Sequence, residues 1–191
     1  ALCFAGGPTY VAYALAVVWI LRRRLKQQVL PEALYELASY TCIKAGCYDM
    51  ANSLPAQMEK LVRQQSALAE RQQASRDLVL RGKPKAAEAV LVRVHYAMFD
   101  QYELVLSTHT DYALLRQHFA GGPVLPLLGD LIGRAARDIE SVAYAMTRNR
   151  PSHAAVDTGE ALRALDAALR ALPPADSEDF NAQAVLRATA K

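Results

Sequence analysis

The sequence has little that would break a helix or cross-link a chain. Among its 191 residues there are 9 glycines, 9 prolines and 3 cysteines, and aromatic residues make up only 7%. No run of alternating β-branched residues is long enough to form a strand, although that alternation is the main sequence signal for β structure. Ala, Leu, Arg, Gln and Glu dominate instead, and all five favour helices. The sequence therefore predicts an all-α fold.

The few cysteines and the small net charge exclude several kinds of site and partner. Cys42 and Cys47 are five apart on a predicted helix, which places them poorly for a disulfide, and with Cys3 they do not have the spacing of a zinc site. Reduced thiols in a cytoplasmic compartment are the expected state. The formal net charge of +3 is too small to argue for nucleic acid. We therefore expect neither a metal site on the cysteines nor a nucleic-acid partner.

A long hydrophobic run, Ala1–Leu21, opens the chain and contains no charged side chain. Its 21 residues match the length that a helix needs to cross a hydrocarbon core ~30 Å thick. Aromatic residues of the kind found at bilayer interfaces occur within it: Tyr10, Tyr13 and Trp19. A basic cluster follows directly: Arg22, Arg23, Arg24 and Lys26. By the positive-inside rule this cluster lies in the cytoplasm, beside the lipid headgroups. We interpret residues 1–25 as a transmembrane or membrane-proximal helix that contacts lipid.

Two other interpretations compete with this one. A cleaved signal peptide has its basic residues before the apolar run, whereas here they come after it. A buried helix of a soluble domain stays open, because Gly6, Gly7 and Pro8 leave only Thr9–Leu21 uninterrupted. Thirteen apolar residues by themselves favour a core or interfacial helix.

The remaining chain has the 3.6-residue periodicity of amphipathic helices. In the first of them, the residues that mark the buried face recur at intervals of three and four positions: Leu30, Leu34, Leu37 and Thr41. We expect five long or medium helices: Pro31–Tyr48, Ala56–Leu80, Lys85–Phe119, Val124–Arg148 and Thr158–Leu172. The last piece of the chain has few apolar residues, so we expect it to pack weakly or to fray. The pattern predicts an antiparallel bundle, with a domain at residues 26–151 and short C-terminal helices of the same domain at residues 152–191 that lead toward a further membrane block.

The segment His95–His118 concentrates the side chains that chemistry uses, but their spacing argues against a site. The segment contains neither His-x-x-x-His nor Glu-x-x-His, the spacings that place two metal ligands on one helix face. The sequence also lacks a Gly-x-Ser-x-Gly elbow and a phosphate-binding loop. We expect neither an enzyme nor a cofactor nor a metal, and interpret these polar groups as pairing across helices.

The segment Phe99–Phe119, FDQYELVLSTHTDYALLRQHF, resembles the cytoplasmic domain of the FUSC-like inner-membrane proteins of the YccS type, relatives of fusaric acid resistance proteins. The resemblance rests on the following residues: Asp100, Glu103, Ser107, His109, Tyr112, Leu115 and Phe119. Ala33–Tyr48 is similar to that family's first helix after a membrane block, and Asn149-Arg150-Pro151 also fits. The acidic residue that the family has soon after the Lys-Ala pair is represented only by Asp49, and the tail past Ser152 has no resemblance.

The resemblance implies a helical domain between two membrane blocks of a bacterial inner-membrane exporter of aromatic acids or similar small molecules. The domain would then face the cytoplasm, form a homo-oligomer, contact the remaining transmembrane segments, and serve assembly or regulation. We expect five residues to form an interhelical polar network that holds the bundle: Asp100, Glu103, Ser107, His109 and Tyr112. Two alternatives stay open. One is a membrane-tethered module that docks a partner protein, and the other is a soluble helical enzyme with Ala1–Leu21 as a core helix.

Overall fold

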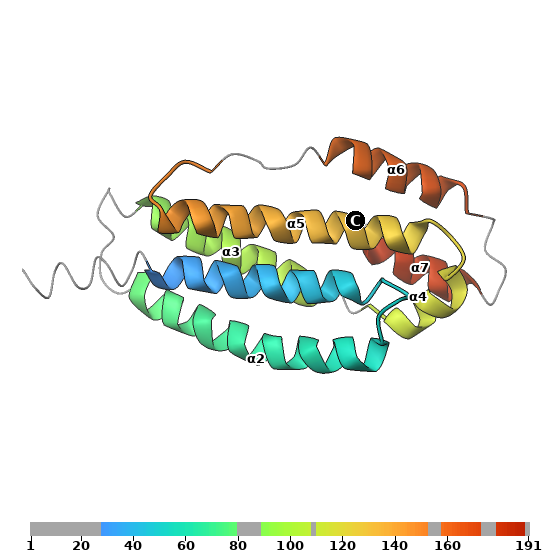
Figure 1. Ribbon diagram of the computed structural model, residues 1–191, viewed down its shortest axis with the longest axis horizontal. Coiled ribbons are helices and arrows are strands. Elements are labelled where there is room, and N and C mark those ends of the chain that lie inside the picture. Colours follow the sequence, from blue (N-terminus) through green and yellow to red (C-terminus); the bar gives the residue numbers. More distant parts are fainter. Residues whose placement is uncertain (1–27, 80–88, 108–109, 153–157, 173–178, 190–191) are drawn as a thin grey trace, which may run out of the picture.

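The helix of residues 28–46 lies at the centre of the long part of the molecule, with other helices on three sides of it (Figure 1). The computed structural model describes residues 28–79, 89–107, 110–152, 158–172 and 179–189, and every regular element in these ranges is an α-helix. The helices after residues 28–46 are α2 (Leu54–Val79), α3 (Ala89–Ser107), α4 (Tyr112–Phe119), α5 (Val124–Thr147), α6 (Gly159–Arg170) and α7 (Asp179–Thr189). The all-α class predicted from the sequence is confirmed for the described residues.

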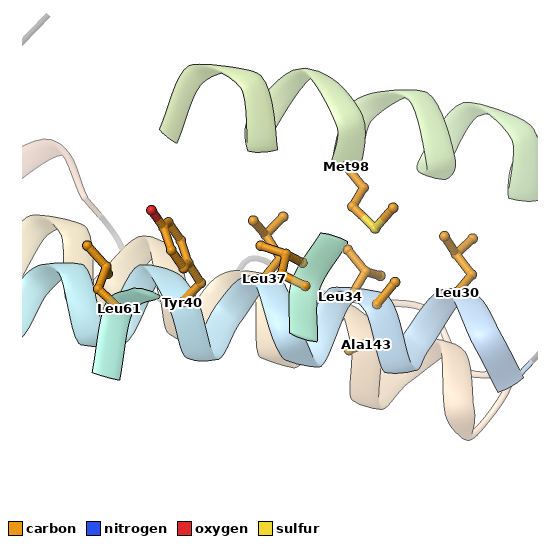
Figure 2. Packing of buried hydrophobic residues seen from close by; sticks show 9 residues of the cluster. Leu30, Leu34, Leu37, Tyr40, Leu61, Met98 and Ala143 are labelled. Atoms are coloured by element: carbon orange, nitrogen blue, oxygen red, sulfur yellow. The ribbon is translucent and has the colours of Figure 1, made fainter. Parts of the chain in front are cut away.

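The 28–46 helix, α2, α3 and α5 run side by side and share the first hydrophobic core. The 28–46 helix supplies most of this core, because its buried residues repeat every three or four positions and so lie on one face. Figure 2 shows Leu30, Leu34 and Leu37 along that face, with Met98 of α3 above them and Ala143 of α5 close by. The predicted stripe of this helix is confirmed, since all three leucines and Thr41 are buried.

A second core lies where the 28–46 helix ends, and the short helices surround it. Cys47 and Tyr48, in the turn after that helix, pack there with buried residues of four helices: Tyr112 and Leu115 of α4, Val124, Leu125 and Leu128 of α5, Leu165 of α6, and Leu186 of α7. In Figure 1, α4 and α7 lie together at this end of the bundle, while α6 lies along the outer side of α5. The two cores together account for all the helices of the described chain.

The long helix expected at Lys85–Phe119 is wrong, because the structure divides this segment into α3 and α4. Asp111 is the N-cap of α4: its carboxylate accepts a hydrogen bond from the Leu114 backbone N–H at 2.9 Å. Backbone N–H groups in the first turn of a helix have no partner within the helix, and such a cap accepts a hydrogen bond from one of them. The cap therefore favours the start of a new helix at this position. The break turns α4 toward the second core, where Tyr112 and Leu115 are buried.

Two other expectations about packing are also wrong. The C-terminal piece does not fray: α7 packs on α4, and its Ala182 and Leu186 are fully buried. In α2, Met58 and Val62 are exposed, although their helical spacing with Leu61 and Leu68 predicts that they belong to the apolar stripe. Three buried residues of α2 follow a seven-residue spacing, Leu61, Leu68 and Ser75, and the buried Gln72 lies one turn before Ser75. The face of α2 that contacts the bundle therefore could not be recognised from its apolar residues alone.

The end of α5 is closed by a Schellman motif. Asn149 has a positive φ of 52°, the left-handed conformation in which Asn is tolerated better than most residues. The backbone N–H of Asn149 donates to the Met146 carbonyl, and that of Arg150 donates to the Ala145 carbonyl at 2.9 Å. Pro151 follows, so the helix ends within a residue of the predicted boundary at Arg148.

Within the described part of the chain, no helix has the length and apolar character needed to cross a bilayer. The segment Ala1–Leu21 and the basic cluster at Arg22, Arg23, Arg24 and Lys26 lie outside the described residues. The transmembrane interpretation of residues 1–25 therefore stays a prediction.

Candidate functional site

The structure spreads the five residues of the predicted polar network over different surroundings. Asp100 and Glu103 are exposed on α3, and Tyr112 is buried on α4. Ser107 is the last residue of α3, and His109 lies outside the described residues. Among the described members, no hydrogen bond joins Asp100, Glu103 and Tyr112. The network as a whole stays a prediction, but the two carboxylates face solvent and only Tyr112 belongs to a core.

Tyr112 packs edge-on against Tyr48, with ring centroids 5.2 Å apart and an interplanar angle of 73°. Such edge-to-face pairs are stabilising beyond the area that they bury. Burial raises the pKa of Tyr48 to about 12, and burial followed by the neighbouring Tyr48 raises the pKa of Tyr112 as well. Both phenols therefore stay neutral at physiological pH and join the turn at residues 47–48 to α4.

Lys44 is a buried cation that joins two helices. Only 6% of it is exposed, and its ammonium group donates a hydrogen bond to the Val105 carbonyl. That carbonyl belongs to the last turn of α3, where helix carbonyls have no partner within the helix and the helix dipole is negative. Burial lowers the pKa of Lys44 to about 8, so most of the side chain is still charged at pH 7. Lys44 thus caps α3 from the 28–46 helix.

A second buried polar contact joins α2 to α3. The Ser75 hydroxyl lies 3.1 Å from His95 Nδ1, and both side chains are almost fully buried. One turn earlier on α2, the amide nitrogen of Gln72 is buried and has no hydrogen-bond partner in the described structure. Burial and then the nearby Arg76 guanidinium lower the pKa of His95, which keeps its ring neutral at pH 7. A neutral histidine can either donate a hydrogen bond to a hydroxyl or accept one from it. Ser75 and His95 can therefore join the two helices in either arrangement.

Arg116 of α4 orders the turn that leaves the 28–46 helix. Its guanidinium donates to the backbone carbonyls of Asp49 and Asn52, the latter at 2.7 Å. The Asp49 carboxylate accepts in turn from the Ala51 backbone N–H at 2.9 Å. Asp49 therefore has a structural contact within its own turn.

Sequence reasoning missed these buried polar groups, although two of them had a signal. Lys44 lies three residues after Thr41, on the same helix face as the buried leucines. Ser75 continues the seven-residue spacing of Leu61 and Leu68. No pattern in the sequence indicated Arg116, because its carbonyl partners precede it by more than sixty residues.

Among the described residues, no three His, Cys, Asp or Glu side chains are grouped in a way that could hold a metal ion. Cys42 is exposed, Cys47 is buried, and both are free thiols. An open cavity of about 510 Å³ lies at the end of the bundle where α3 begins and α5 ends.

Comparison with known families identifies the chain. The model of the FUSC-like family, described as FUSC-like inner membrane protein yccS, matches residues 1–190. The chain belongs to the FUSC-like family. No curated protein and no solved structure matches it. The FUSC-like match includes α6 and α7, so it extends past Ser152, where the sequence had offered no resemblance. The family is one of inner-membrane proteins, which indicates a role related to membrane transport.

Proposed function

We propose that this FUSC-like chain is the cytoplasmic helical domain of an inner-membrane transporter that exports aromatic acids or similar small molecules. Residues 1–25 attach the domain to the membrane, and the bundle serves assembly or regulation of the transporter. The family match over residues 1–190 is the observation that supports this proposal most strongly. The buried polar contacts described above brace helices against one another, so we propose no catalytic role for them.

Apolar side chains on the outer surface of α3 support a role in assembly. Tyr96, Phe99 and Leu104 are 53%, 40% and 59% exposed, respectively. Tyr96 and Phe99 are three residues apart and so lie on neighbouring parts of one helix face. Aromatic residues are enriched in protein interfaces, because they bury a large area with few rotatable bonds. We propose that this face contacts a second copy of the chain, and the docking of a different partner protein is the second candidate.

The orientation can be tested with the natural cysteines. In a Cys3→Ser background, the 191-residue chain is expressed in bacterial cells, and spheroplasts are treated with a maleimide that does not cross membranes. We expect Cys42, which is exposed, to react only after lysis, whereas the buried Cys47 stays unreactive until the protein is denatured. A Cys42→Ser variant controls for the assignment of the label. Labelling of Cys42 in intact spheroplasts would contradict the cytoplasmic orientation.

The assembly role can be tested by light scattering of the 191-residue chain in a neutral detergent over a dilution series. We expect a dimer or larger assembly that a Tyr96→Ser, Phe99→Ser double variant weakens. Val62→Ser is the matched control, because Val62 is 64% exposed on α2, away from the proposed face. A monomer at every concentration would contradict self-assembly in this domain and would favour the docking module.

A further inference from the structure

An open cavity of about 510 Å³ lies at one end of the bundle, lined by residues of the 28–46 helix, α3 and α5 and of the turn after α5. At this end lie the first described turn of the 28–46 helix, the end of α2, the start of α3 and the end of α5, as Figure 1 shows on its left side. Seven residues line the cavity: Gln28, Val90, Leu91, Met146, Thr147, Asn149 and Arg150. Its volume lies within the range of roughly 300–1,000 Å³ that small-molecule sites occupy.

The lining combines an apolar part with a set of hydrogen-bond donors. Val90 and Leu91 of α3 and Met146 of α5 supply the apolar part. Arg150, Asn149 and Gln28 supply donors, and Arg150 adds a positive charge. Arg150 and Asn149 are held in place by the Schellman motif, which uses their backbone N–H groups and leaves both side chains available. A ligand with an anionic head and an apolar body would match both parts.

The surroundings of the cavity are positively charged. Arg76 near the end of α2, Arg93 near the start of α3, and Arg148 after α5 are all exposed at this end, besides Arg150. Two described carboxylates, Glu32 and Asp77, also lie toward this end, fewer than the four arginines. Glu32 forms an ion pair with Arg71 at 2.9 Å, and Asp77 accepts a hydrogen bond from Gln73.

The position of this end in the chain points to a lipid as the ligand. Residue 28 comes two positions after Lys26, the last residue of the basic cluster, and the cluster itself follows Ala1–Leu21. If residues 1–25 enter the membrane, as the proposed function states, this end of the bundle lies at the headgroup layer. Anionic headgroups attract Arg and Lys near the membrane surface, and an Arg guanidinium recognises phosphate through paired hydrogen bonds.

We propose that the cavity at this end binds the phosphate of an anionic phospholipid headgroup. Arg150 and Asn149 donate to the phosphate oxygens, while Val90, Leu91 and Met146 contact the glycerol and the start of the acyl chains. The site would make the bundle sensitive to the lipid composition of the membrane. This inference rests on the proposed function for its placement at the membrane, but its headgroup preference can be measured separately.

The test measures the melting temperature of the 191-residue chain in neutral detergent micelles. Dihexanoyl-phosphatidylglycerol, dihexanoyl-phosphatidylcholine or glycerol 3-phosphate is added at matched concentrations. A ligand at tenfold excess over its dissociation constant raises the melting temperature of a chain of this size by roughly 3–6 °C. We expect that rise with phosphatidylglycerol and less than half of it with the other two compounds.

Two variants locate the effect. Arg150→Gln removes the charge and keeps the backbone bonds of the Schellman motif, so we expect it to fold normally and to lose the phosphatidylglycerol response. Arg63→Gln is the matched control, because Arg63 is exposed in the middle of α2 and does not line the cavity. An equal response in Arg150→Gln and Arg63→Gln would overturn the site, since the effect would then be general surface attraction.

The remaining outcomes are also decisive. Equal shifts with phosphatidylcholine would overturn the preference for an anionic head, and equal shifts with glycerol 3-phosphate would show a soluble phosphate ligand and overturn the lipid assignment. Flotation of the chain with phosphatidylcholine vesicles tests the membrane attachment separately. A chain that does not float contradicts the proposed function, whereas a chain that floats without a phosphatidylglycerol shift contradicts the cavity assignment only.

Discussion

Alanine at Gly129 is expected to destabilise the bundle, whereas alanine at Gly133, one turn later on α5, is expected to stabilise it. A Cβ atom on Gly129 would lie 3.3 Å from the Ala45 carbonyl oxygen and 3.4 Å from Tyr48 Cβ. Neither atom is at the end of a flexible side chain, so the two segments must separate to admit the methyl group. A Cβ atom on Gly133 would meet Arg137 Nη1 at 3.7 Å and Ala45 Cβ at 4.0 Å, which are ordinary contacts.

The magnitudes follow from two opposing effects. Replacing a glycine inside a helix with alanine stabilises the folded state by roughly 0.5–1 kcal/mol, because the unfolded chain has less freedom to lose. Gly133→Ala should show this gain. Inserting a methyl group into a close contact costs roughly 1–3 kcal/mol, so Gly129→Ala should show a net loss of about 1–2 kcal/mol. For a chain of this size, 1 kcal/mol corresponds to a shift in melting temperature of roughly 2–4 °C.

The assay is thermal unfolding of the two variants and the parent chain, followed by circular dichroism at 222 nm in one detergent buffer. Gly133→Ala should melt above the parent and Gly129→Ala below it. A Gly129→Leu variant should melt lower still, because more atoms enter the same contact. Equal stabilisation by alanine at the two positions would refute the reasoning, since it would show that α5 does not lie tightly against the end of the 28–46 helix.

Two further predictions concern pH. Because burial lowers the pKa of Lys44 to about 8, its charge destabilises the folded state below pH 8, and the free energy of unfolding should rise by roughly 1 kcal/mol between pH 7 and 9. Lys44→Met should lack this rise in denaturation curves measured across that range, and a persisting rise would contradict the assignment. Because burial and Arg76 lower the pKa of His95, the unfolded chain binds a proton first, and stability should fall as the pH drops below 6.5. His95→Asn, which keeps a bonding partner for Ser75, should reduce this loss in melts at pH 7.5 and 5.5, and an identical loss in both proteins would contradict it.

The helices that the sequence predicted well are those whose periodicity is strong over their whole length. Leu30, Leu34 and Leu37 repeat at helical spacing and are all buried. In α5 the apolar residues at helical spacing from Leu128 to Ala143 are likewise buried or half-buried. Such helices are recognisable because the pattern of one segment determines which of its faces can be buried.

The failures come from contacts with partners that are distant in sequence. The apolar spacing from Val94 to Leu115 continues across the break between α3 and α4, so it indicated one helix where there are two. The Asp111 cap was a local signal, but the direction of α4 depends on Tyr48, which lies in another part of the chain. In α7, Leu186 is buried only because α4 and α5 leave an apolar surface for it.

The candidate site residues show the same difference between patterns within one segment and contacts between distant segments. The predicted network took its residues from the resemblance, and the structure leaves Asp100 and Glu103 exposed on α3. The buried polar groups that do join helices were outside that list. Lys44 meets a carbonyl 61 residues away, and Ser75 meets His95, 20 residues away.

The sequence by itself determined the all-α class, the family and the two best-patterned helices, because composition and periodicity act within one segment. Only the tertiary structure decided where α3 ends, which polar groups are buried, and which segments line the cavity beside Arg150. Each of these depends on segments brought together by folding. Sequence periodicity describes one segment at a time, so it cannot predict a contact between two segments that are distant in the chain.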